Sequence, residues 1–181
     1  MYDWVIRNAT PADLPAVEAL RRADGDCLGF IPKAKYEHIV HKTLDRGRRR
    51  WFWERLLVCE DNSEVTGFLL GNIGKKQSKI EQVCVRNDAR RMERALSLER
   101  HFSDESTRRG HPRIRARVAA DIEATLFWAA AGYDIVETTT STFLNVRESK
   151  SKRLLLVYEK EVADNILWLP SSDQRWAVTT A

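Results

Sequence analysis

Several features are scarce in this chain of 181 residues, and each scarcity argues against a class of protein. The three cysteines (Cys27, Cys59 and Cys84) form no CxxC pair, which argues against a disulfide framework and against a zinc site. No stretch reaches the roughly 18 consecutive apolar residues of a membrane helix, and residues 1–4 begin no signal peptide. We therefore expect a cytoplasmic protein that neither enters a membrane nor binds a metal.

Acidic residues are outnumbered by basic ones. Lys and Arg total 30 and Asp and Glu total 26, which gives a net charge of +4 and a pI of about 9.1. This balance suits a polyanionic ligand, but it does not choose between coenzyme A and nucleic acid. Apolar residues make up 43% of the chain, enough for a continuous core.

The order of the expected elements is that of a mixed α/β domain. Apolar periodicity predicts strands over 4–8, 56–59, 65–70, 80–85, 114–119, 133–138 and 154–158, with helices over 10–23, 33–44, 90–109 and 122–131. Asp61-Asn62-Ser63 predicts a hairpin turn. We expect one domain over 1–162 and an extension over 163–181. The extension carries two tryptophans and either docks on the domain or reaches a partner, such as a second copy.

A basic segment follows the expected strand 80–85. It carries Arg90 and Ala95 at the ends of a pattern that resembles R/Q-x-x-G-x-G/A of the GNAT acetyltransferase superfamily, with Glu93 at the first glycine position. In that family, backbone N–H groups at a helix start bind the diphosphate of acetyl-CoA. Two interpretations stay open for Glu93. Its side chain turns outward while nearby arginines attract the cofactor, or the site has lost its affinity for coenzyme A.

A second segment resembles the family pattern N-x-x-A-x-x-F-Y-x-x-x-G-F. Ala124, Phe127 and Gly132 match it, and Trp128 stands where many members have a tyrosine that protonates the departing thiolate. An indole N–H donates a hydrogen bond but does not act as an acid. We expect Trp128 to pack in the core or in the pocket wall, and the proton to come from another group or from water.

The resemblance covers about residues 4–160 and implies both a fold and a reaction. The fold is α/β, with a mixed, mostly antiparallel sheet of about seven strands and helices on both faces. The reaction is direct transfer of an acetyl group from acetyl-CoA to an amine of a small molecule or a protein. The implied cofactor-binding residues are Val83, Cys84, Val85, Arg90, Arg91, Met92, Glu93, Arg94, Ala95, Phe127 and Trp128.

The implied general base is Glu81, because the family often has its base at this strand position. Apolar neighbours would make its carboxylate a stronger base, whereas a solvent-facing Glu81 would be an ordinary strand residue. Phe30 and Tyr36 lie where the family shapes its acceptor pocket. Cys84 is expected to be a small buried residue, and His38 and His41 to lie on a solvated helix surface.

Two other functions stay open. Arg48, Arg49 and Arg50 precede two tryptophans, and this pattern either contacts nucleic acid or packs at the end of a helix. The second motif also resembles GNAT-like proteins of phages and mobile elements, including Mom-type enzymes that modify adenine in DNA. The second of these other functions, suggested by Glu93 and Trp128 together, is an interaction module without catalysis.

Overall fold

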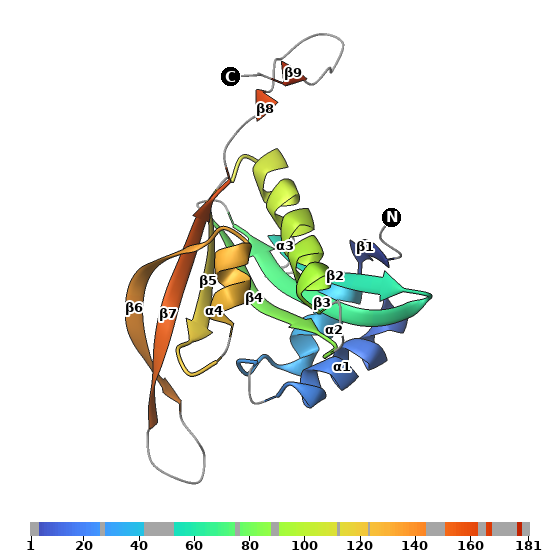
Figure 1. Ribbon diagram of the computed structural model, residues 1–181. Helices are drawn as coiled ribbons and strands as arrows, with labels where there is room; N and C mark the ends of the chain where they lie inside the picture. The colour runs from blue at the N-terminus through green and yellow to red at the C-terminus, as the bar shows by residue number, and fades with distance from the viewer. Residues whose placement is uncertain are drawn as a thin grey trace.

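The chain folds around a sheet of seven strands with helices on both faces (Figure 1). The structure is a computed structural model. It describes residues 4–25, 28–41, 53–74, 77–87, 91–111, 113–122, 124–143, 151–162, 166–167 and 177–178. Within this part of the chain, no helix is both long and apolar enough to cross a membrane.

Seven strands form the main sheet in the order β1-β2-β3-β4-β5-β7-β6. They are β1 (Trp4–Asn8), β2 (Glu54–Asp61), β3 (Glu64–Ile73), β4 (Ser78–Val85), β5 (Arg113–Ala119), β6 (Asp134–Phe143) and β7 (Ser151–Glu161). All neighbours are antiparallel except β4 and β5, which are parallel. A separate two-stranded sheet pairs β8 (Ile166–Leu167) with β9 (Ala177–Val178). The expected mixed, mostly antiparallel α/β fold is confirmed.

The helices divide the apolar residues into two clusters, one on each face of the sheet. On one face, α3 (Arg91–Arg108) and α4 (Thr125–Ala130) cover the larger cluster, in which Phe102 is fully buried. On the other face, α1 (Leu14–Ala23) and α2 (Lys33–His41) cover the smaller cluster. Glycine allows α3 to approach the sheet, because a Cβ atom at Gly71 would lie 2.5 Å from the Phe102 ring.

Several element boundaries differ from the predicted ones. The second helical motif starts at Thr125 instead of Ile122, because the backbone N–H groups of Ile122 and Ala124 bond within a preceding turn. β6 continues past Thr138 to Phe143, through threonines whose β-branched side chains favour strands. The predicted hairpin turn is confirmed, with Asn62 and Ser63 in the left-handed region at φ 50° and 65°.

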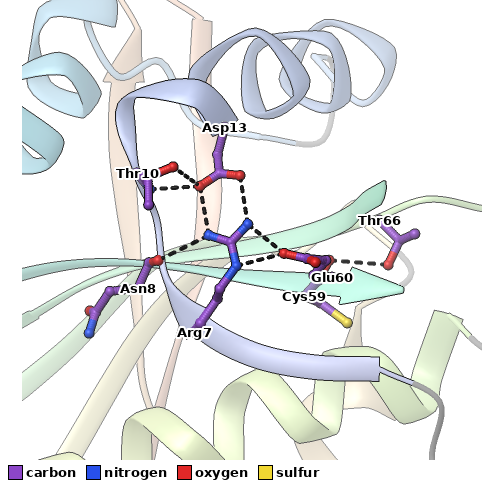
Figure 2. Close-up of polar contacts among 7 residues, drawn as sticks. All are labelled: Arg7, Asn8, Thr10, Asp13, Cys59, Glu60 and Thr66. Atoms are coloured by element: carbon purple, nitrogen blue, oxygen red, sulfur yellow. Dashed lines mark hydrogen bonds and ion pairs between the residues drawn. The ribbon is translucent and has the colours of Figure 1, made fainter. Parts of the chain in front are cut away.

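A partly buried ion pair ties β1 to the start of the first helix (Figure 2). The Arg7 guanidinium donates to both carboxylate oxygens of Asp13 at 2.7 and 2.8 Å, and it also contacts Glu60 on β2. Asp13 accepts two further hydrogen bonds, from the backbone N–H and the hydroxyl of Thr10, just before the 3-10 turn Pro11–Asp13. These contacts, the Arg7 hydrogen bonds first, lower the pKa of Asp13 from 3.8 to about 2.

We predict that Asp13 stabilises the fold at neutral pH and that acid removes this stabilisation. Because its pKa is lower in the folded state, its contribution is complete above pH 4 and is lost as the pH falls through about 2. The shift corresponds to about 2 kcal/mol. Asp13→Asn should lower the free energy of unfolding in urea by about this amount at pH 7, and by much less at pH 2.

Asp121 provides the matched control, because it also pairs with an arginine, Arg153, but on the exposed surface. Asp121→Asn should change the unfolding free energy far less than Asp13→Asn. Equal effects of the two substitutions at pH 7, or an Asp13→Asn effect that does not depend on pH, would contradict this account.

Candidate active site

The parallel pairing of β4 with β5 ends part-way along both strands. The described register joins only Ser78–Ile80 of β4 to Ile114–Ala116 of β5. Beyond Ile80, no pairing with β5 is found in the described length of β4, and the two ribbons diverge in Figure 1. Alternate backbone groups along 81–85 therefore face away from β3 toward a strand that has left the ladder. This edge of β4 can receive hydrogen bonds from an extended ligand.

A β-bulge lies at the point where β5 departs. On β3, Leu70 pairs with Gln82 and the next residue, Gly71, pairs with Ile80, so Glu81 is an extra residue in β4. A bulge bends its strand and redirects a side chain, and bulges are common beside active sites. The register thus places the predicted base, Glu81, at the divergence of β4 and β5.

The Glu81 carboxylate is held by a lysine that the sequence analysis did not single out. Lys35, in the first turn of α2, donates from Nζ to Glu81 Oε2 at 2.5 Å and lies 3.1 Å from Glu54 Oε1 at the start of β2. The side chain of Glu81 is 31% exposed. The surroundings differ from the apolar ones expected, because the nearest charged partner of Glu81 is an ammonium group.

The next residues of β4 alternate between the two faces of the sheet. Val83 and Val85 pack in the cluster under α3, and Val85 is buried. Cys84 is buried on the other face, and its thiol donates to Asp24 Oδ2 at 3.3 Å. These side chains serve the core, so contacts between this strand and a ligand would come from its backbone.

The two predicted substrate residues lie in contrasting surroundings. Tyr36 is buried, and its hydroxyl donates to Gln82 Oε1, the side chain next to Glu81 on β4. Gln82 in turn donates from Nε2 to the Gly29 carbonyl at 2.6 Å. Phe30, next to Gly29, is 83% exposed in the segment before α2. Tyr36 thus positions α2 and the Gly29 segment, while the ring of Phe30 is available for contact.

The start of α3 presents some of the predicted cofactor residues to solvent. Met92 and Glu93 are exposed, so the Glu93 side chain does not block the core side of the helix. Ala95 is buried against the sheet. Arg90 and the side chain of Arg91 lie outside the described residues. The exposure of Glu93 leaves both interpretations of this residue open.

Arg94 is buried, unlike Met92 and Glu93. Its guanidinium pairs with Asp61 at 2.5 Å and lies 5.5 Å from the Trp4 ring centroid. The side chains of Arg94 and Asp61 are only 7% and 14% exposed. The predicted attraction between Arg94 and the cofactor is therefore replaced by an ion pair that joins α3 to the β2–β3 turn.

Trp128, a residue of α4, lies at the centre of an aromatic cluster. It is 5% exposed, stacks on Tyr158 with centroids 5.7 Å apart, and meets Phe127 and Tyr133 edge-on at 4.9 and 5.0 Å. Its burial agrees with the core or pocket-wall position expected for it. Phe127 is half-buried at the border of this cluster.

The two tyrosines beside Trp128 have their hydroxyls engaged in the protein. Tyr133 donates to Glu99 Oε1 at 3.0 Å, and burial together with this carboxylate raises the pKa of Tyr133 well above its ordinary value. The Tyr158 hydroxyl lies 3.4 Å from Thr125 Oγ1. Both phenol groups beside Trp128 thus have hydrogen-bond partners within the protein.

Solved structures show what this geometry is similar to. Ard1 from Thermoplasma volcanium superposes with a TM-score of 0.68 at 17% identity, over 90% of this chain and 99% of that one. A ribosomal-protein-alanine N-acetyltransferase from Brucella melitensis gives 0.66 at 19% identity, with 87% and 99% covered. A GNAT-family acetyltransferase from Streptococcus pneumoniae gives 0.64 at 13% identity, with 88% and 99% covered. The chain has the GNAT fold.

These identities show the fold of the chain and leave its substrate to be argued from its own residues. No protein-family sequence model matches the chain, and no curated protein matches it in sequence. In the GNAT fold of this protein, Val83, Val85, Ala95, Phe127 and Trp128 share the hydrophobic cluster on the α3–α4 face of the sheet. Sequence reasoning missed Lys35 and Glu54, which lie far from Glu81 in the chain and belong to no motif.

The remaining predicted residues do not form a second site in the described structure. His38 and His41 lie in the last turn of α2. Among the described residues, no group of three His, Cys, Asp or Glu side chains could hold a metal ion. Arg48, Arg49 and Arg50 lie outside the described residues, so the nucleic-acid interpretation stays a prediction.

We predict that Arg94 is a structural residue of this GNAT domain. Arg94→Ala leaves the largely buried Asp61 without its guanidinium, which should lower the free energy of unfolding by about 3 kcal/mol. In a double-mutant cycle with Asp61→Asn, the two effects should be strongly coupled. The exposed Arg86–Glu64 pair is the control, and Arg86→Ala should cost much less. Additive effects of Arg94 and Asp61 would show that the pair does not stabilise the fold.

Proposed function

We propose that this protein is an acyl-CoA-dependent N-acyltransferase that transfers an acetyl group from acetyl-CoA to an acceptor amine. The observation that carries the proposal is the position of Glu81. It is the extra residue of the β4 bulge, and it follows directly on Ile80, where the pairing of β4 with β5 ends. A carboxylate is thereby placed beside the backbone edge that can bind an extended acyl donor.

The described residues fit such a donor. The open edge of β4 over 82–85 offers backbone donors and acceptors to its pantetheine arm, and the start of α3 offers backbone N–H groups to its diphosphate. Glu93 is exposed and can turn away from an anion. Because Arg94 is engaged with Asp61, we expect the positive charge to come from Arg90 and Arg91, whose side chains lie outside the described residues. When bound, acetyl-CoA supplies the thioester whose carbonyl carbon the amine attacks.

The chain itself supplies a base and leaves the final proton to water. Glu81 Oε2 is within hydrogen-bond distance of an ammonium group, so it is placed to accept a proton from an amine at this position. The departing thiolate is a moderate base, with an ordinary thiol pKa near 8.5, so water can protonate it. We assign Trp128 a packing role in the wall of the site, where it contacts Phe127, and no role as a proton donor.

Calorimetric titration with acetyl-CoA tests the binding part of the proposal. Wild-type protein should bind with micromolar affinity, and Arg90→Ala should weaken binding because it removes positive charge next to the diphosphate. Glu93→Gly should strengthen binding, since it removes a negative charge and admits the phosphate closer to the backbone. Absence of binding at millimolar acetyl-CoA would refute the proposal and favour an interaction module.

Thiol release from acetyl-CoA tests the role of Glu81. With a panel of amines that includes peptide N-termini and aminoglycosides, Glu81→Gln should lower kcat by about 10²- to 10⁴-fold and leave KM for acetyl-CoA nearly unchanged. Glu64→Gln is the control, because this glutamate lies on the exposed turn side of β3. Equal turnover in Glu81→Gln and wild type would rule out Glu81 as the base.

A further inference from the structure

We propose that Lys35 is an acceptor within the protein itself and that its Nζ becomes acetylated in the site described above. This inference rests on the proposed function, because it needs a bound acyl thioester. It identifies a modification site on α2, with an acyl-coenzyme A thioester as the acetyl source. Three observations carry it: the contact of Lys35 with Glu81, the fixation of α2 against β4, and the low exposure of the Lys35 side chain.

Lys35 Nζ occupies the position that an acceptor amine needs. It donates to Glu81 Oε2 at 2.5 Å, and Glu81 is the bulge residue next to the end of the β4–β5 ladder. An amine that transfers its proton to a base must lie within hydrogen-bond distance of it. Among the described lysines, Lys35 donates a hydrogen bond to Glu81, so it meets this requirement.

The position of Lys35 is fixed from both sides. Two consecutive residues of α2 bind two consecutive residues of β4: Lys35 pairs with Glu81, and Tyr36 donates to Gln82. Oε1 of Glu54, at the start of β2, lies 3.1 Å from the same Nζ. The amine is therefore preorganised beside the donor edge, which favours reaction within the complex over reaction in solution.

A neighbouring lysine on the same helix offers a comparison. Lys33 is 67% exposed and pairs only loosely with Glu37, at 3.6 Å, whereas the side chain of Lys35 is 17% exposed. A reagent that attacks amines from solvent should therefore modify Lys33 first. Acetyl transfer inside the site should instead modify Lys35 first, because Lys35 is hydrogen-bonded to Glu81 and Lys33 pairs with Glu37.

The chemical step balances with the groups named. Lys35 Nζ gives a proton to Glu81 Oε2, and its lone pair forms a bond to the thioester carbonyl carbon. Glu81 returns this proton to solvent, and as the carbon–sulfur bond breaks, the attacking nitrogen gives its second proton to Glu81. The thiolate takes a proton from water, so one proton is released overall. The products are acetyl-lysine at position 35 and free coenzyme A. Because an acetylated Nζ carries no charge, Glu81 and Glu54 lose their shared cation and Glu81 becomes free for an external amine.

Peptide mass spectrometry after incubation with acetyl-CoA tests the proposal. Cleavage after Asp26 and Glu37 releases residues 27–37, which contain both lysines, so one peptide reports on both sites. In wild type, acetylation should favour Lys35 over Lys33 by at least about tenfold. Glu81→Gln should abolish this preference by lowering acetylation at Lys35 alone, because the general base is lost. Lys35→Arg should gain no acetyl group at position 35 and leave the slow labelling of Lys33 unchanged.

Cofactor-free protein supplies an independent readout. Acetic anhydride should label Lys33 faster than Lys35, because solvent exposure alone sets the rate at which this reagent labels each lysine. This order is the reverse of the one expected with acetyl-CoA. Thermal unfolding should show that Lys35→Gln, which removes the charge between Glu54 and Glu81, lowers the Tm more than Lys35→Arg. Equal Tm values for these two variants would show that the lysine is not held between the carboxylates, and would overturn the proposal.

Calorimetry on the same samples separates the possible failures. If acetyl-CoA binds but labels Lys33 at least as fast as Lys35, or labels neither, the self-acetylation is refuted while the proposed function stands. Equal labelling of Lys35 in wild type and Glu81→Gln refutes it as well. If acetyl-CoA does not bind at all, both the proposed function and this inference fail.

Discussion

The parallel pairing of β4 with β5 is the constraint on which the candidate site depends. Three residue pairs hold the two strands together, from Ser78–Ile114 to Ile80–Ala116, and the pairing then stops. The same location carries the bulge residue Glu81, so one irregularity in the sheet both opens a backbone edge and places a carboxylate beside it. Clusters on both faces support the strands at this point, with Ile80 buried on one and Gln82 on the other.

The helices hold this irregularity in place. α3 packs so closely that Gly71, opposite the bulge, has no room for a Cβ beside Phe102. α2 is bound on the other face through Lys35 to Glu81 and Tyr36 to Gln82. A charged group at a sheet edge normally samples many rotamers, and these contacts reduce that freedom before any ligand binds. The same contacts explain why a lysine is held next to the proposed base.

The order of helices and strands could be predicted because amphipathic periods and turn residues are local signals. Asn62 and Ser63 marked the hairpin, and the apolar positions of α3 marked its buried side. The contacts of the site could not be predicted in this way. Lys35 and Glu81 lie 46 residues apart, and their pairing exists only because α2 packs across β4.

Two residues of the family-like segments, Trp128 and Arg94, compare differently with what the sequence led us to expect. Trp128 is buried among Phe127, Tyr133 and Tyr158, as an aromatic residue on the inner face of a helix should be. Arg94 could not be assigned from its sequence, because the charge that attracts it belongs to Asp61 in a distant turn. Membership of a basic cluster in the sequence therefore does not show what Arg94 contacts in the fold.

We infer that the edge of β4 beyond Ile80 binds the acyl donor. Hydrogen–deuterium exchange of the protein with and without saturating acetyl-CoA tests this claim most directly. We expect slower exchange for amides over 82–85 and in the first turn of α3, with no change in β1 and β2. Protection that appears elsewhere and leaves 82–85 unchanged would contradict it, because the donor would then bind outside the divergence of β4 and β5.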